Sequence, residues 1–150
     1  MPATPTYSVA LVDAIKAELE AHLPAALITA GLPAVKSWCY GQRELAAITN
    51  CPQVEIDLGD GPQTGSVGYA KAEDELLVIA QLAATDEETL HRYLLGYGDA
   101  IRSELEKITS PRVAVTGVDR GPSASKGNAI FRAVIVTGTI VWAHTRGSVT

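Results

Sequence analysis

Apolar and polar positions follow two different periods along this chain, and both are clearest between residues 74 and 108. The run from Asp74 to Ala84 is too apolar for a solvated loop and predicts a strand. The next four residues, 85–88, place a threonine hydroxyl (Thr85) at the N-cap and a glutamate (Glu88) at the third helical position, an arrangement that begins helices. The helix that follows carries a single apolar face, which consists of Leu90, Tyr93, Leu94, Tyr97, Ile101, Leu105 and Ile108.

A second amphipathic helix is predicted near the N-terminus. It begins near Ser8 and carries an apolar stripe at intervals of four residues, made of Leu11, Ile15, Leu19 and Leu23. Pro24 lacks a backbone N–H, so we expect the helix to kink or end there. Residues 25–30 then predict a further short turn, which Gly31 closes in a left-handed conformation.

The remaining elements are strands and loops. Residues 53–58 alternate, so Val54, Ile56 and Leu58 are expected to face the core while Gln53, Glu55 and Asp57 face water. Residues 35–40 and 112–116 predict shorter strands, residues 69–71 predict a return arm, and residues 43–49 predict one helical turn. The stretches 59–68 and 121–128 predict long loops, the first of them a loose hairpin if residues 69–71 pair back. Because a strand follows the Gly-rich loop at 59–68, this loop does not have the pattern of a phosphate site.

The last strand is unusually long. Residues 130–142 are apolar on both faces, as expected of a strand that is covered on both sides, and Gly138 marks a bend or bulge within it. The order of elements predicts an α+β fold: a mostly antiparallel sheet of four to five strands with two main helices packed on one face. We expect a single domain over residues 1–150, with an extended C-terminal tail at 144–150.

Composition and charge narrow the class of protein. With 47% hydrophobic and 19% charged residues among 150, the chain is too apolar to be disordered. A net charge of −5 disfavours non-specific DNA binding, which requires clustered Lys and Arg. The longest apolar run, residues 129–143, is too short for a bilayer and contains an arginine, and residues 1–5 lack the pattern of a signal peptide. We therefore expect no membrane association.

Candidate chemistry is sparse. Cys39 and Cys51 are predicted to be reduced thiols, and neither has a second ligand at metal-binding spacing. His22, His91 and His144 lie on different predicted elements, so none has an evident acid–base partner. The sequence therefore predicts no catalytic, cofactor-binding or metal site, and we expect no enzymatic activity. The alternative from another class is a small enzyme or ligand-binding domain, whose polar pocket would draw on Asp57, Asp60 and His91.

Several features favour assembly instead. Gly96 and Gly98 each cost about 1 kcal/mol in a helix interior relative to Ala, which predicts that another backbone, from the sheet or from a second subunit, packs closely there. The two long loops are larger than hairpins need, and such loops often carry contacts. The candidate residues for a subunit or partner interface lie on these loops and near the C-terminus. They are Asp60, Gln63, Ser123, Lys126, Trp142 and Arg146.

Four segments, in order, carry a family resemblance. They are Cys51-Pro52-Gln53-Val54-Glu55-Ile56, Tyr93…Tyr97-x-Asp99-Ala100-Ile101-Arg102-x-x-Leu105, Val115-x-Gly117-Val118-Asp119 and Ile130-Phe131-Arg132-Ala133. With the N-terminal helix before them, they give a pattern over nearly the whole chain that resembles the tail terminator (tail completion) proteins of long-tailed bacteriophages.

The resemblance implies a structural role. Such proteins form a ring, commonly a hexamer, at the head-proximal end of the tail tube, where they stop tube polymerisation and join the tail to the head connector. The implied partners are other copies of the chain, the tail tube protein and the connector or stopper protein. DNA passes through the lumen without specific binding. The implied location is the tail–neck junction of the virion, after synthesis in the host cytoplasm. The alternative within the same class is a neck protein, such as a head–tail connector or stopper.

Overall fold

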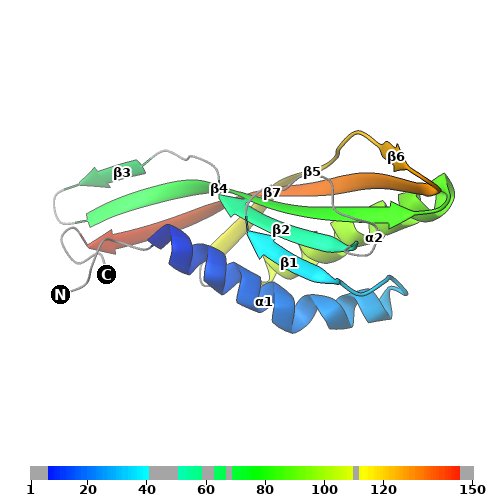
Figure 1. The fold of residues 1–150 in the computed structure, drawn as a ribbon. Coiled ribbons are helices and arrows are strands. Elements are labelled where there is room, and N and C mark those ends of the chain that lie inside the picture. The colour runs from blue at the N-terminus through cyan, green and yellow to red at the C-terminus, as the bar shows by residue number, and fades with distance from the viewer. Residues whose placement is uncertain (1–6, 41–50, 59–62, 67–68, 110–111, 146–150) are drawn as a thin grey trace.

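The computed structural model describes residues 7–40, 51–58, 63–66, 69–109 and 112–145 (Figure 1). Two helices, α1 (Tyr7–Thr29) and α2 (Glu87–Glu106), pack on one face of a seven-stranded sheet. In chain order the strands are β1 (Ser37–Tyr40), β2 (Gln53–Leu58), β3 (Gln63–Ser66), β4 (Tyr69–Ala84), β5 (Arg112–Arg120), β6 (Ala124–Lys126) and β7 (Ala129–Thr145).

The sheet is mostly antiparallel, which confirms the predicted fold class. Its main path runs β1-β2-β4-β7-β5, and only the β1–β2 pair is parallel. The two further strands exceed the expected number of four to five: β3 pairs with β4, and β6 pairs with β7. Both come from the segments predicted as long loops, because each of these segments folds back on the neighbouring strand as a hairpin.

The core lies between the helices and the sheet. On β4 the alternate residues Leu76, Val78, Ala80 and Leu82 are fully buried beneath the helices, and β7 contributes Val134, Val136 and Ile140 to the same layer. The predicted apolar face of α2 is confirmed, since all its members except the half-buried Tyr93 are buried. Each large apolar side chain buried in this way contributes about 1.5–3 kcal/mol of transfer free energy.

Helix α1 corrects one prediction and confirms another. It continues unbroken through Pro24, so the predicted end at this residue is wrong. The missing N–H costs little here because Pro24 lies on an exposed face, and Glu20, whose carbonyl would have accepted from it, is also exposed. The helix ends as predicted at Gly31, which has a φ of +72° while the N–H of Leu32 donates to the carbonyl of Leu27 at 2.9 Å.

The start of α2 lies one residue later than the prediction. The N-cap is Asp86 rather than Thr85, and the Asp86 carboxylate accepts from the backbone N–H of Thr89 at 2.8 Å and from the Thr89 hydroxyl at 2.8 Å. These bonds lower the pKa of Asp86, the backbone donor having the larger effect. A carboxylate that accepts two bonds and faces the positive end of the helix dipole is a better cap than a hydroxyl.

The glycines of α2 contact side chains rather than a neighbouring backbone. A Cβ at Gly96 would lie 2.6 Å from a terminal methyl of Leu32, and a Cβ at Gly98 would lie 3.2 Å from Val118 and 3.3 Å from Val134. The sheet therefore packs against Gly98, whereas the segment after α1 packs against Gly96. That segment is also tied to α2 by the buried Tyr97, whose hydroxyl donates to the carbonyl of Pro33 and whose pKa is raised, mainly by burial.

The bulge expected at Gly138 lies on the neighbouring strand. β5 pairs with β7 at Val115–Gly138 and again at Gly117–Thr137, so Thr116 is the extra residue, and its hydroxyl donates to the carbonyl of Thr137 at 3.2 Å. Gly138 is needed because a Cβ there would lie 3.1 Å from the carbonyl oxygen of Ala114. Close approach of the two backbones at the bulge is thus the reason for the glycine.

Candidate assembly surfaces

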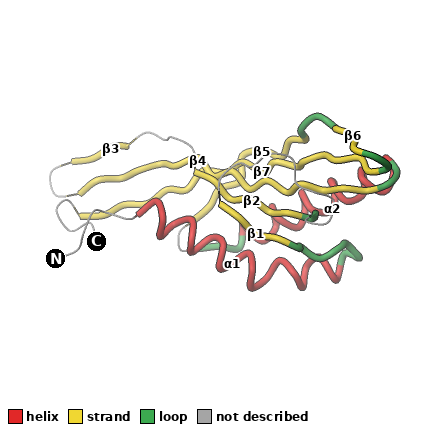
Figure 2. The backbone as a smooth tube through the Cα atoms, in the orientation of Figure 1, coloured by secondary structure: helices red, strands yellow, loops and turns green. Residues whose placement is uncertain are grey.

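One end of the sheet projects from the body as a narrow arm. β4 pairs with β7 along its whole length, from Tyr69–Thr145 to Ala84–Ile130, as one continuous strand. The predicted return arm at residues 69–71 is confirmed, since these residues of β4 pair back with residues 64–66 of β3. β3 and the adjoining ends of β4 and β7 run on beyond the first turn of α1 (Figures 1 and 2). We call β3 with residues 69–73 and 141–145 the β3 arm.

The β3 arm brings two of the predicted interface residues together. Gln63 of β3 pairs with Ala72 of β4, and Ala72 pairs with Trp142 of β7, so the three backbones form one row across the arm. Residues 144 and 145, expected to belong to a C-terminal tail, form the last pairs of β7. Asp60 and Arg146 lie outside the described residues.

The other two predicted interface residues lie at the opposite end of the molecule. Ser123 and Lys126 are exposed around the hairpin of β6, which turns at Gly127 with a φ of +61° and pairs with the start of β7. Lys126 pairs with Ala129, 13 residues along β7 from Trp142. At about 3.3 Å per residue these positions are roughly 43 Å apart. The six candidates therefore do not form one patch: those that the structure describes fall at two ends.

The residues of the alternative enzymatic hypothesis are not brought together as a group. His91 is exposed beside a cavity of about 370 Å³, lined also by Glu87, Glu88, Ser123 and Arg132. Asp57 does not line this cavity, and its carboxylate accepts from the backbone N–H of Leu58 at 2.9 Å. Among the described residues there is no group of three His, Cys, Asp or Glu side chains placed to hold a metal ion.

A buried polar cluster on the sheet face opposite the helices was missed by the sequence analysis. Glu55 is 1% exposed, and one of its carboxylate oxygens accepts from the amide of Gln53 at 2.9 Å and from the amide of Gln81 at 2.7 Å. The Ser37 hydroxyl donates to the side-chain oxygen of Gln53 at 3.1 Å. The prediction that Gln53 and Glu55 face water is therefore wrong, because they satisfy one another in the interior. Gln81, a lone polar residue in an apolar strand, was the available signal.

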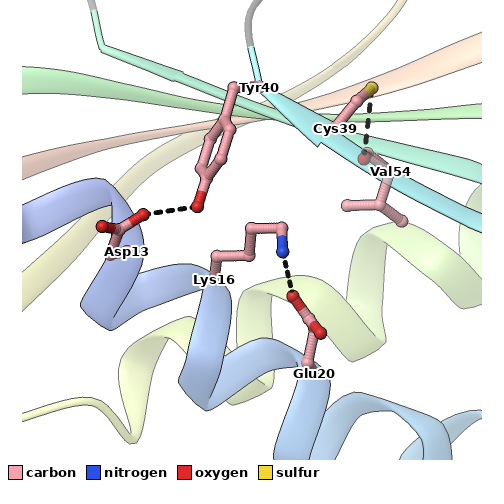
Figure 3. A network of polar contacts seen from close by, with 6 residues as sticks. All are labelled: Asp13, Lys16, Glu20, Cys39, Tyr40 and Val54. Carbon is pink, nitrogen blue, oxygen red and sulfur yellow. Dashed lines mark hydrogen bonds and ion pairs between the residues drawn. The ribbon is translucent and has the colours of Figure 1, made fainter. Parts of the chain in front are cut away.

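A second set of polar contacts fastens α1 to the edge strand β1 (Figure 3). The Tyr40 hydroxyl donates to the carboxylate of Asp13, and the Lys16 ammonium pairs with Glu20 while lying 5.4 Å from the centre of the Tyr40 ring. The hydrogen bond to Asp13 raises the pKa of Tyr40, and the bond to Glu20 raises the pKa of Lys16. These are exposed contacts of modest energy, so they orient α1 rather than stabilise the fold.

Both cysteines are present as reduced thiols. Cys39 is half-buried, and its sulfur lies 3.8 Å from the carbonyl oxygen of Val54, to which it donates. Cys51 is 4% exposed, and burial raises the pKa of its thiol although Lys36 acts in the opposite sense. A thiol in this state is a poor nucleophile, so Cys51 has the properties of a packing residue.

The two helices leave a shallow groove on the outer surface. It has a volume of about 750 Å³, and its walls consist mainly of small residues, among them Ala26 of α1 and Gly96 and Ala100 of α2. Polar side chains at its rim are largely paired: His22 lies 3.4 Å from Glu18, and Lys107 lies 3.1 Å from Glu104. Over the described part of the chain, neither helix combines the length and the apolar character that a membrane crossing requires.

Comparison with solved structures finds chains of similar structure. No protein-family model matches the chain, and no curated protein matches it. A chain in a solved structure described as the virion of a native gene transfer agent (GTA) particle is 15% identical, with 85% of this chain and 90% of that chain covered and a TM-score of 0.36.

Proposed function

We propose that this protein is a structural component of a phage virion that forms a ring at the head-proximal end of the tail tube. The ring stops tube polymerisation and joins the tail to the head connector. Its role is geometric rather than catalytic, so no cofactor takes part. The proposal starts from the resemblance of the sequence to tail terminators and is supported by the shape of the subunit.

The β3 arm is the observation that carries the proposal. The arm consists of three strands beyond the first turn of α1, and a sheet of this size needs a hydrophobic face or a packing partner for independent stability. Arms of this kind gain stability by packing on a neighbour, as ring subunits do. The arm also holds Gln63 and Trp142 in one row, while Ser123 and Lys126 lie at the far end of β7. Two separated contact ends suit a subunit that lies between a tube and a connector.

The charge of the chain suits the passage of DNA through such a ring. At −5 per subunit, a ring would repel the DNA backbone in general rather than trap it. In this proposal the partners are other copies of the chain, the tail tube protein and the connector or stopper protein, and the site of action is the tail–neck junction of the virion.

The proposal is tested by electron microscopy of tail tubes that lack this protein, mixed with the purified chain. We expect ring-shaped caps on one end of each tube. The variant K71P removes a backbone donor in the middle of the β3 arm, where residue 71 pairs with Thr64 on one side and Ala143 on the other, so it should abolish capping.

K71T is the matched control. It removes the same lysine but keeps the backbone donor and introduces a residue that favours strands, so it should cap tubes as the unmodified chain does. Both variants leave the helix-covered core unchanged and should retain the helical circular dichroism of the parent. A chain that ignores tubes contradicts the proposal and favours the neck-protein alternative. Capping by K71P at the level of K71T contradicts the role of the β3 arm.

A further inference from the structure

β5 forms an open edge of the sheet along nine residues. It pairs with β7 on one side, and no described strand pairs with its other side. Most of its side chains are exposed, including those of Arg112, Ala114, Asp119 and Arg120. An edge strand of this length offers a row of backbone donors and acceptors to another chain, and proteins commonly cover or blunt such edges.

Exposed apolar side chains accompany this edge on the helix side. Val118 of β5 is 40% exposed and Leu95 of α2 is 49% exposed, and both line one cavity of about 230 Å³ together with Gly98. These are two of the four large apolar residues that stand out as exposed among the described residues. Their position beside unpaired backbone indicates a surface that a second chain covers.

The bulge at Thr116 makes the two halves of β5 complementary to each other. Val113 and Val118 pair with Ile140 and Val136, so both lie on the helix side of the sheet. Arg112 and Asp119 pair with residues 141 and 135 of β7, so both lie on the opposite side. Without the extra residue, positions seven apart would fall on opposite faces.

We propose that the β5 edge binds the β5 edge of a second copy of this chain, antiparallel and about a two-fold axis near Thr116. In this register Arg112 lies opposite Asp119 of the partner subunit, and Val113 lies opposite Val118 of the partner subunit. The symmetry forms each pair twice. Opposite charges directly across antiparallel strands stabilise the pairing, and like charges there destabilise it.

The charges of β5 select this register over its neighbours. The two β5 strands could also pair in a register shifted by two residues, which keeps each side chain on the same face of the sheet. In that register Ala114 lies opposite Asp119 of the partner subunit, and neither ion pair forms. The other charged groups of this region do not oppose Arg112. Arg120 lies on the helix side and lines the same cavity as Asp99 and Arg102, while Arg102 is paired with Glu106 at 2.9 Å.

The β5 pair is a property of the free chain and does not rest on the proposed function. A two-fold pair turns its subunits in opposite directions, whereas all subunits of a ring on one tube end face the same way. The β5 pair is therefore distinct from any contact between neighbouring subunits of a ring.

The test uses sedimentation equilibrium of the full chain and of two single charge reversals, R112D and D119R. The unmodified chain should be a dimer. Each variant replaces two attractive cross-strand pairs by two repulsive ones, so its dissociation constant should rise by roughly 30-fold or more. An equal mixture of the two variants should form dimers again, because each mixed pair restores both ion pairs.

Controls separate this register from a general effect of charge. R92D and E88R alter exposed residues on α2 away from β5 and should leave the dimer unchanged. A second pair of variants, R112E and D119K, repeats the test if either first variant has an altered thermal unfolding curve. A monomeric unmodified chain, single variants that stay dimeric, or a mixture that stays monomeric would each overturn the β5 pair. Tube capping is measured separately, so any of these results can occur while the proposed function holds.

Discussion

Removing the carboxyl group of Glu55 should destabilise the protein strongly, although the alternating pattern of its strand predicts that this side chain faces water. The side chain is 1% exposed and accepts two amide hydrogen bonds on one oxygen, from Gln53 at 2.9 Å and from Gln81 at 2.7 Å. In the variant E55A both amides lose this acceptor in the interior. An unsatisfied buried donor costs about 1–3 kcal/mol, so the expected loss in the free energy of unfolding is about 2–6 kcal/mol.

The effect can be measured by urea unfolding and by thermal denaturation. For a domain of this size 1 kcal/mol lowers Tm by about 2–4 °C, so E55A should lower it by about 4 °C or more. E55Q keeps one oxygen acceptor in place, so it should cost less than E55A, about 1 kcal/mol. The control is D57N on the same strand and face, which keeps an acceptor for the Leu58 N–H and should have little effect.

A small effect of E55A would refute the reasoning. If E55A lowers the free energy of unfolding no more than D57N does, the bonds to Gln53 and Gln81 do not stabilise the folded state. The double variant E55A/Q81A gives a further check, because it also removes one of the two amides that lost Glu55 as an acceptor and should recover part of the loss.

Three further predictions concern the bulge, the helix cap and the end of the chain. G138A should cost about 1–3 kcal/mol in urea unfolding, because the added methyl would lie 3.1 Å from the backbone oxygen of Ala114, which cannot move easily. D86A should lower Tm at neutral pH, since two bonds from Thr89 are lost. Those bonds lower the pKa of Asp86, so the stabilisation that they give is fully present above the unfolded pKa of about 3.9. As the pH falls through the lowered pKa of the folded state, Asp86 becomes protonated, and the difference in Tm between D86A and the parent should disappear. A chain truncated after Ala143 should keep its helical circular dichroism and Tm but assemble poorly in light scattering, because it lacks the last pairs of the β3 arm; a truncated chain that fails to fold would place this end in the core.

Local pattern predicted the parts of the fold that local physics determines. The apolar face of α2 follows from helical spacing alone, and the left-handed Gly31 follows from the rule that only glycine ends a helix there without strain. The buried state of Glu55 could not be read in the same way, because its partner Gln81 is 26 residues away and the pairing depends on the register of β2 with β4. Periodicity gives the face of a residue, but only the register gives its neighbour.

The candidate surfaces show the same division. Loop length and composition identified Gln63 and Lys126 as interface candidates without showing that they lie at opposite ends of the sheet. The row formed by Gln63, Ala72 and Trp142 joins three strands from distant parts of the sequence. The sequence also could not predict that β5 forms an edge of the sheet, because the order of strands depends on the whole sheet rather than on any one segment.

The measurement that tests the central claim most directly is tube growth. Tail tubes are incubated with the purified chain, fresh tube protein is added, and the lengths of tubes are measured by negative-stain microscopy together with the subunit count of any cap. We predict that one end of each tube carries a ring and adds no further tube protein. Tubes that elongate at both ends as fast as they do without the chain would contradict the proposed function.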